Sequence, residues 1–252
     1  MSFAVSADAY DQYMGRWSRP LAPQLANLAG VVAGLSVLDV GCGPGALTSE
    51  LATRLGPAAV TAVDPSVSFV AAARASNPGV DVRQAAAEDL PFPDATFDVA
   101  LAQLVVHFMA DPVAGLGEMA RVTRPGGVVA ACVWDFAGDN GPLGPFWMAA
   151  RELDTDVEDE SRLAGTRTGQ LTELFEAARL RGVEETALAV SRDHSSFEEW
   201  WEPFTRGVGP GGSYMARLDT QQRAALRERC RSMLPAGPFT ATARAWAARG
   251  IV

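Results

Sequence analysis

A short apolar run that ends in three closely spaced glycines is the feature that most constrains the fold. The run covers residues 36–40 and leads into Gly41, Gly43 and Gly45, after which residues 47–55 show a helical pattern. Glycines at such a turn let the backbone bend sharply and approach a ligand closely. The free N–H groups at the start of the next helix then face that ligand. The segment predicts a strand–loop–helix unit with a binding site at the loop.

Strands and helices alternate through the rest of the first half of the chain. Strands are predicted over 36–40, 60–63, 80–82, 97–102 and 128–133, and helices over 47–55, 66–76 and 111–122. Residues 1–30 also have a helical rhythm, which Pro20 and Pro23 are expected to break. Short apolar strands alternating with helices are typical of an α/β protein whose parallel sheet is covered on both faces.

The second half has a looser pattern. Helices are predicted over 170–181, 196–206 and 219–234, and strands over 183–190 and 239–247. Five aromatic residues in this half are candidates for an apolar substrate pocket, with packing between helices as the alternative: Phe146, Trp147, Trp200, Trp201 and Phe204. The acidic residues 152–160 and the arginines of 219–234 are both predicted to be solvated faces, and no metal site is expected.

Composition limits the partners and the compartment. The 252 residues include 21 basic ones, all arginine, and 30 acidic ones, which gives a formal net charge of -9. An acidic surface repels phosphate backbones, so nucleic acid is not expected as a partner. The apolar runs are shorter than the roughly 18 residues of a membrane span, and no Sec signal is visible at the N-terminus. The three cysteines lack CxxC spacing and are expected to be reduced thiols, so we predict a cytoplasmic protein.

Two carboxylates flank the glycine loop. Asp64 ends the second predicted strand, 23 positions after Gly41, which places it at the neighbouring strand end within reach of a ribose diol. Asp39 comes just before the glycines, where it is a poor neighbour for a pyrophosphate but suits a ligand with an ammonium or sulfonium group. The spacing from Gly41 to Ala46 also fits a loose dinucleotide fingerprint, and a tight turn without a ligand is the other alternative.

Two further motifs identify a family. Residues 87–92 read AEDLPF and precede the strand at 97–102, while residues 121–127 read RVTRPGG. Together with VLDVGCGPG and VDP, in this order, they resemble class I S-adenosylmethionine (SAM)-dependent methyltransferases, within the small-molecule branch that includes methyltransferase type 11. The resemblance is close over residues 31–134. It implies a Rossmann-like, mostly parallel sheet of seven strands whose last strand is antiparallel, with SAM across the carboxyl ends of the first, second and fourth strands.

The resemblance also implies roles for individual residues. The backbone of Gly41, Cys42 and Gly43 would line the methionine part of SAM, with Asp39 near its ammonium and Gln103 beside it. Asp64 would accept both ribose hydroxyls. The adenine would contact Pro65, Ser66, Ala87 and Glu88. Many relatives place an Asp before the Ala-Glu pair to hold the adenine amine, and this chain has Ala86 there.

Three other residues are candidates near the cofactor. In related enzymes a leading helix closes over SAM, so Tyr13 and Arg16 could grip its carboxylate; simple aromatic packing of this segment is the alternative. His107 lies just beyond the strand at 97–102, where the methyl group should point, and it could act as the catalytic base for the acceptor. The alternative is a histidine that only packs there. His194 is expected to be a cap or surface residue.

These features predict one domain over residues 1–252. It would comprise N-terminal lid helices (1–30), a core (31–194), a helical cap insertion (195–237) and the last strand (238–252). The predicted function is transfer of a methyl group from SAM to a small, partly apolar acceptor by in-line displacement, with S-adenosylhomocysteine (SAH) as product, in a monomer or homodimer. The alternatives are a non-catalytic SAM-binding protein, an NAD-dependent oxidoreductase and an enzyme with a macromolecular substrate.

Overall fold

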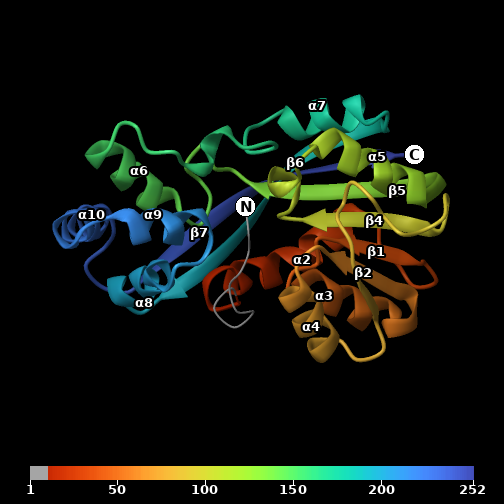
Figure 1. The fold of residues 1–252 in the computed structure, drawn as a ribbon, viewed down its shortest axis with the longest axis horizontal. Coiled ribbons are helices and arrows are strands. Elements are labelled where there is room, and N and C mark those ends of the chain that lie inside the picture. The colour runs from red at the N-terminus through yellow and green to blue at the C-terminus, as the bar shows by residue number, and fades with distance from the viewer. Residues whose placement is uncertain (1–10) are drawn as a thin grey trace.

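A seven-stranded mixed sheet in the order β3-β2-β1-β4-β5-β7-β6 forms the centre of the computed structural model, which describes residues 11–252 (Figure 1). Its strands are β1 (Val37–Val40), β2 (Val60–Asp64), β3 (Asp81–Gln84), β4 (Phe97–Gln103), β5 (Thr123–Trp134), β6 (Arg181–His194) and β7 (Phe239–Ile251). Neighbours from β3 to β5 pair in parallel, whereas β7 is antiparallel to both β5 and β6. The predicted fold class is confirmed.

Helices cover both faces of this sheet (Figure 1). The helical elements are η1 (Asp11–Gly15), α2 (Arg16–Leu28), α3 (Ala46–Leu55), η2 (Pro57–Ala59), α4 (Val67–Ser76), η3 (Val106–Phe108), α5 (Pro112–Val122), α6 (Gly144–Leu153), η4 (Glu160–Arg162), α7 (Gln170–Ala177), α8 (Phe197–Trp201), η5 (Glu202–Arg206), α9 (Gly209–Arg217) and α10 (Thr220–Met233). Helices α2, α3 and α4 lie on one face, and α5 and α7 lie on the other.

Successive residues of the parallel strands belong to different core clusters. Val37 packs in the cluster that contains Leu21 of α2, whereas Leu38 packs in the cluster that contains Leu116 of α5. All four residues of β1 are buried. Strands buried on both faces have to be apolar at nearly every position, which explains the short continuous apolar runs in the sequence.

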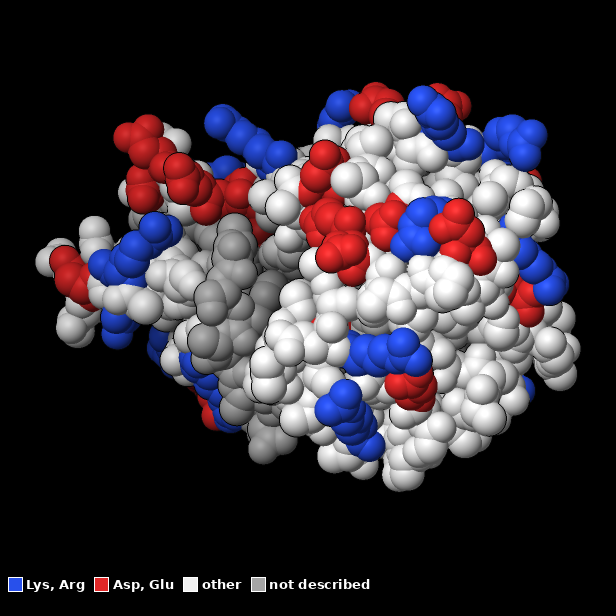
Figure 2. Space-filling view, turned by 45° about the vertical axis from the view of Figure 1, so that its right-hand side comes forward, with Lys and Arg blue, Asp and Glu red and all other residues white. Residues whose placement is uncertain are grey.

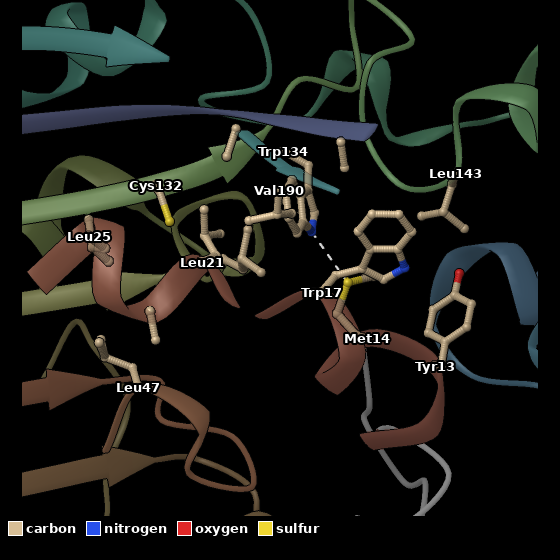
Figure 3. Close-up of a cluster of buried hydrophobic side chains, with 14 of the residues drawn as sticks. Tyr13, Met14, Trp17, Leu21, Leu25, Leu47, Cys132, Trp134, Leu143 and Val190 are labelled. Atoms are coloured by element: carbon tan, nitrogen blue, oxygen red, sulfur yellow. Dashed lines mark hydrogen bonds between the residues drawn. The ribbon is translucent and has the colours of Figure 1, made fainter. Parts of the chain in front are cut away.

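Helix α2 continues through Pro20 and Pro23, so the predicted break is wrong. Each proline removes one backbone hydrogen bond from the helix, but the buried face of α2 packs against the sheet along its whole length. Figure 3 shows Trp17, Leu21 and Leu25 on this face. Burial of these side chains stabilises the helix more than the two missing bonds destabilise it.

Helices α6, α8, α9 and α10 gather at one end of the molecule, beside the ends of β6 and β7 (Figure 1). Arg229 of α10 forms an ion pair with Glu152 of α6 at 2.5 Å, so α6 packs with this group although it precedes residue 195. Aromatic residues of these helices and of η5 contact one another: the stacked rings of Phe146 in α6 and Phe204 in η5 have centroids 4.7 Å apart. This arrangement matches the packing alternative for the aromatic segment.

Two predictions about charged and polar residues need correction. Glu160, at the end of the acidic segment, is only 3% exposed, so that segment is not a solvated face throughout. His194 is 2% exposed and stacks on Phe239, so it is not a surface residue. Of the arginines of α10, Arg223 and Arg231 are exposed, whereas Arg227 and Arg229 are half-buried. Arg227 and Arg231 both pair with Glu198.

The visible surface mixes both charges. Figure 2 shows basic side chains scattered over one face, several of them directly beside acidic ones. Within the part of the chain that the structure describes, no helix is long and apolar enough to cross a membrane.

Arg121 connects the two later sequence motifs. Its guanidinium donates to the carbonyl oxygens of Leu90 and Phe92, at 3.0 and 2.9 Å, and forms ion pairs with Glu118 and Asp94. Glu118 also accepts a hydrogen bond from the backbone N–H of Leu90. The motifs at 87–92 and 121–127 are thus held together by one arginine, which gives this residue a structural role.

Candidate functional site

A cavity of about 600 Å³ lies at the carboxyl ends of β1, β2 and β4, and we refer to it as the large cavity. A volume of this size suits a drug-sized ligand or cofactor. Ten of the predicted cofactor residues line it: Asp39, Gly41, Cys42, Gly43, Asp64, Pro65, Ser66, Ala87, Glu88 and Gln103. The parallel pairing explains why residues so distant in sequence meet, because it aligns the ends of neighbouring strands.

The glycine loop has a shape that only glycine allows at two positions. Gly41 has a φ of +70°, and a Cβ atom there would lie 2.3 Å from a methyl carbon of Val105. Gly45 has a φ of +99°, and a Cβ atom there would lie 2.5 Å from the Asn77 side-chain nitrogen. The N–H groups of Gly41 and Cys42 both donate to the carbonyl oxygen of Val63, which holds the loop against the end of β2.

Asp64 accepts hydrogen bonds from the loop and from the start of α4. Its Oδ2 accepts from the Gly43 N–H at 2.9 Å, and its Oδ1 accepts from the Ser66 N–H at 2.8 Å. Burial raises the pKa of this carboxyl, while the two backbone hydrogen bonds lower it. A carboxylate oxygen can accept more than one hydrogen bond, so both oxygens retain capacity for the hydroxyls of a ribose.

Asp39 is a buried acid with unused hydrogen-bonding capacity. It is 1% exposed, and the Thr48 hydroxyl donates to its Oδ2 at 2.6 Å. Its Oδ1 has no hydrogen-bond partner among the described residues. Burial, together with the smaller effect of the nearby Asp64 charge, raises the pKa of Asp39 to about 7. A cationic ligand in the large cavity would stabilise the ionised form of this group.

Gln103 also lines this cavity and has a buried acceptor without a partner among the described residues. Its Nε2 donates to the carbonyl oxygen of Ser18 at 3.0 Å, which ties β4 to helix α2. Its Oε1 is buried without a partner among the described residues. Buried polar atoms are rarely left unpaired in folded proteins. The two unpaired oxygens of Asp39 and Gln103 fit an ammonium group, which offers three donors.

Glu88 holds the segment after β4 rather than pointing freely at a ligand. Its Oε1 accepts from the backbone N–H of Ala110 at 2.7 Å and of Asp111 at 3.3 Å. Five residues of the segment it holds line the large cavity and were not predicted from the sequence: Leu104, Val105, Phe108, Met109 and Ala110. The apolar run directly after a strand end was the signal that could have found them.

The structure places three predicted site residues away from the large cavity. His107 and Tyr13 line a neighbouring cavity of about 30 Å³, and Arg16 and Tyr13 line another of about 20 Å³. His107 is buried, and its Nδ1 has no hydrogen-bond partner in the described part of the chain. Burial lowers the pKa of His107 to about 3, so its ring is neutral at physiological pH.

Figure 3 shows Tyr13 beside Leu143. It also shows the Trp134 indole donating to the sulfur of Met14, at 3.3 Å.

Comparisons with known proteins concern mainly the first half of the chain. Residues 38–131 match a family described as a methyltransferase domain. The chain is 36% identical to a malonyl-[acyl-carrier protein] O-methyltransferase of Erwinia billingiae, over 51% of this chain and 50% of that protein. It is 37% identical to a ubiquinone/menaquinone biosynthesis C-methyltransferase of Bdellovibrio bacteriovorus, over 48% of this chain and 52% of that protein. The chain thus matches about half the length of these curated relatives.

Similarity to solved structures extends over nearly the whole chain. The YcgJ protein of Bacillus subtilis superposes with a TM-score of 0.59 and 18% identity, over 94% of this chain and 98% of that one. A geranyl diphosphate C-methyltransferase of Streptomyces coelicolor, solved with Mg²⁺, geranyl diphosphate and SAH, gives a TM-score of 0.56 and 15% identity, over 94% and 80%. At these identities the likeness concerns the fold.

Proposed function

We propose that this chain carries a class I SAM-dependent methyltransferase domain and that it transfers a methyl group from SAM to a small, partly apolar molecule. The observation that carries the proposal is the pair of unpaired buried oxygens on Asp39 and Gln103, both in residues that line the large cavity. The ammonium of SAM would satisfy both. A dinucleotide pyrophosphate would meet a buried carboxylate at the same place.

The residues of the large cavity would hold SAM along its length. Asp39 and Gln103 would bind the ammonium, Asp64 would accept the ribose hydroxyls, and the loop backbone of 41–43 would pack along the methionine part. The adenine would contact Pro65, Ser66, Ala87 and Glu88. When bound, SAM supplies an electrophilic methyl carbon on a sulfonium, which passes to the acceptor as the carbon–sulfur bond breaks and sulfur keeps the electron pair.

The protein would contribute chiefly by alignment and by exclusion of water. In-line displacement needs the acceptor atom, the methyl carbon and sulfur on one axis, and positioning of this kind can supply several kcal/mol. His107 is the proposed base for an acceptor that must lose a proton, because its Nδ1 has no hydrogen-bond partner among the described residues. His107→Ala should lower kcat while leaving SAH affinity unchanged; undiminished turnover would remove it as a base.

A non-catalytic SAM-binding protein is the second candidate. The observation that favours it is the small size of the cavity beside His107, about 30 Å³, which is too small for a whole acceptor molecule in the observed conformation. Binding of SAH without turnover on any small acceptor would support this candidate.

Calorimetric titration of the ligand-stripped protein with SAH tests the proposal, with NADH as the control. Micromolar binding of SAH alone is expected. Tight binding of NADH would instead favour an oxidoreductase, and binding of neither compound would contradict the proposed cofactor.

A further inference from the structure

The cavity of about 30 Å³ next to the large cavity has an unusual lining, and we call it the aromatic cavity. Leu104 and Phe108 line both cavities and so form the wall between them. The rings of Tyr13, Trp134 and Phe136 contribute further aromatic surface. The volume holds one group of about the size of a water molecule or an ammonium.

Among the described residues that line this cavity, Glu160 is the one with a carboxylate. It is 3% exposed and lies at the start of η4, in the connection between α6 and α7. The indole N–H of Trp147 donates to its Oε2 at 3.0 Å. Within residues 11–252, no arginine forms an ion pair with Glu160. Arg151 pairs with the adjacent Asp159 instead. Burial raises the pKa of Glu160 to about 7, as expected for a carboxyl without a counter-ion.

His107, the titratable nitrogen base among the described lining residues, does not supply the missing positive charge. Its ring is neutral because burial lowers its pKa to about 3. It packs against Phe108 and Phe136, with centroid distances of 3.9 and 5.8 Å. The aromatic cavity therefore combines one buried carboxylate with several aromatic rings and contains no cationic side chain from the described chain.

We propose that the aromatic cavity binds a basic nitrogen of the methyl acceptor and that Glu160 is the residue that selects for it. An ammonium supplies the counter-charge that residues 11–252 do not, and aromatic rings attract a cation through their π faces. A hydroxyl of the same size could accept or donate one hydrogen bond but would leave the carboxylate without a counter-ion. The body of the acceptor would extend past Leu104 and Phe108 towards the large cavity. This inference rests on the proposed function and names its substrate class as a small amine.

Paired amines and alcohols test the inference on the full chain saturated with SAH. Calorimetry would compare benzylamine with benzyl alcohol, and phenethylamine with 2-phenylethanol, for the wild-type protein and Glu160→Gln. Glutamine keeps an oxygen for the Trp147 indole, so the variant should fold. Glu158→Gln, which removes an exposed carboxylate two residues away, is the matched control.

We expect the amines to bind the wild-type protein and the Glu158→Gln control at least about tenfold more tightly than the alcohols, and Glu160→Gln to lose this preference. Phe136→Leu, a second variant, should weaken the amines more than the alcohols because it removes an aromatic wall. Equal binding, a preference for alcohols, or a preference that survives Glu160→Gln overturns the amine site. SAH affinity is measured in parallel. If the wild-type protein does not bind SAH, the proposed function itself is overturned.

Discussion

The backbone N–H of Gly43 donates to Oδ2 of Asp64 across a distance of 2.9 Å. This bond joins the glycine loop after β1 to the end of β2, so the loop and the carboxylate hold each other in place. The Ser66 N–H donates to the other oxygen. Asp64 thus has a structural role in addition to its proposed contact with ribose.

Removal of this carboxylate should weaken cofactor binding. Asp64→Ala is expected to reduce the affinity for SAH by about 1–3 kcal/mol, as for loss of hydrogen bonds to a charged group. Calorimetry on protein shown to be folded would measure it. Asp81→Ala on the neighbouring strand β3 is the control, because that carboxylate is half exposed and pairs only with Arg83 at the surface. Unchanged affinity of Asp64→Ala would contradict the ribose assignment.

A methyl group at Gly41 should destabilise the protein through both strain and collision. Gly41→Ala places Cβ 2.3 Å from Val105 and forces alanine to a φ of +70°. The left-handed backbone alone costs about 1–2 kcal/mol, and overpacking adds about 1–3 kcal/mol. Gly34→Ala is the matched control, since Gly34 has a φ of +93° but open space around it. If chemical denaturation shows that Gly41→Ala and Gly34→Ala lose the same unfolding free energy, the Val105 side chain moves aside without an energetic cost.

Cofactor binding should depend on pH through Asp39. The pKa of this carboxyl is raised to about 7 in the free protein, and the ammonium of SAH would favour its ionised form. Binding between about pH 5.5 and 7 therefore releases a proton, so affinity should rise with pH by up to about tenfold per unit and level off above pH 7. Asp39→Asn cannot release that proton and should give a flat profile. A flat profile in the wild-type protein would contradict an ammonium site at Asp39.

Arg121 should matter for stability more than other surface arginines do. Arg121→Ala removes donors to the Leu90 and Phe92 carbonyls along with two ion pairs, and we expect a loss of about 1–3 kcal/mol in unfolding free energy. Arg167→Ala breaks only an exposed pair with Glu173 and should cost about 0–1 kcal/mol. Denaturant titration measures the unfolding free energy of both variants. Similar small losses in the two would contradict a structural role for Arg121.

Local pattern was sufficient to predict the sheet and the centre of the large cavity. Each predicted strand overlaps an observed one, because strands of a doubly covered sheet need continuous apolar runs. Asp39, Asp64 and Gln103 meet at one cavity because parallel strands bring their carboxyl ends to the same edge. Helix α6 was not predicted, and its packing against α10 depends on residues about 80 positions away.

The sequence by itself determined which segments become strands and where the glycines and carboxylates of the site stand, since these depend on short-range pattern and backbone preference. Only the tertiary structure decided that α2 runs through two prolines, that Glu160 is buried while Glu158 is exposed, and that the segment after β4 separates two cavities. The burial of a side chain and its pKa depend on contacts between segments that are distant in sequence, so a local sequence pattern does not predict them.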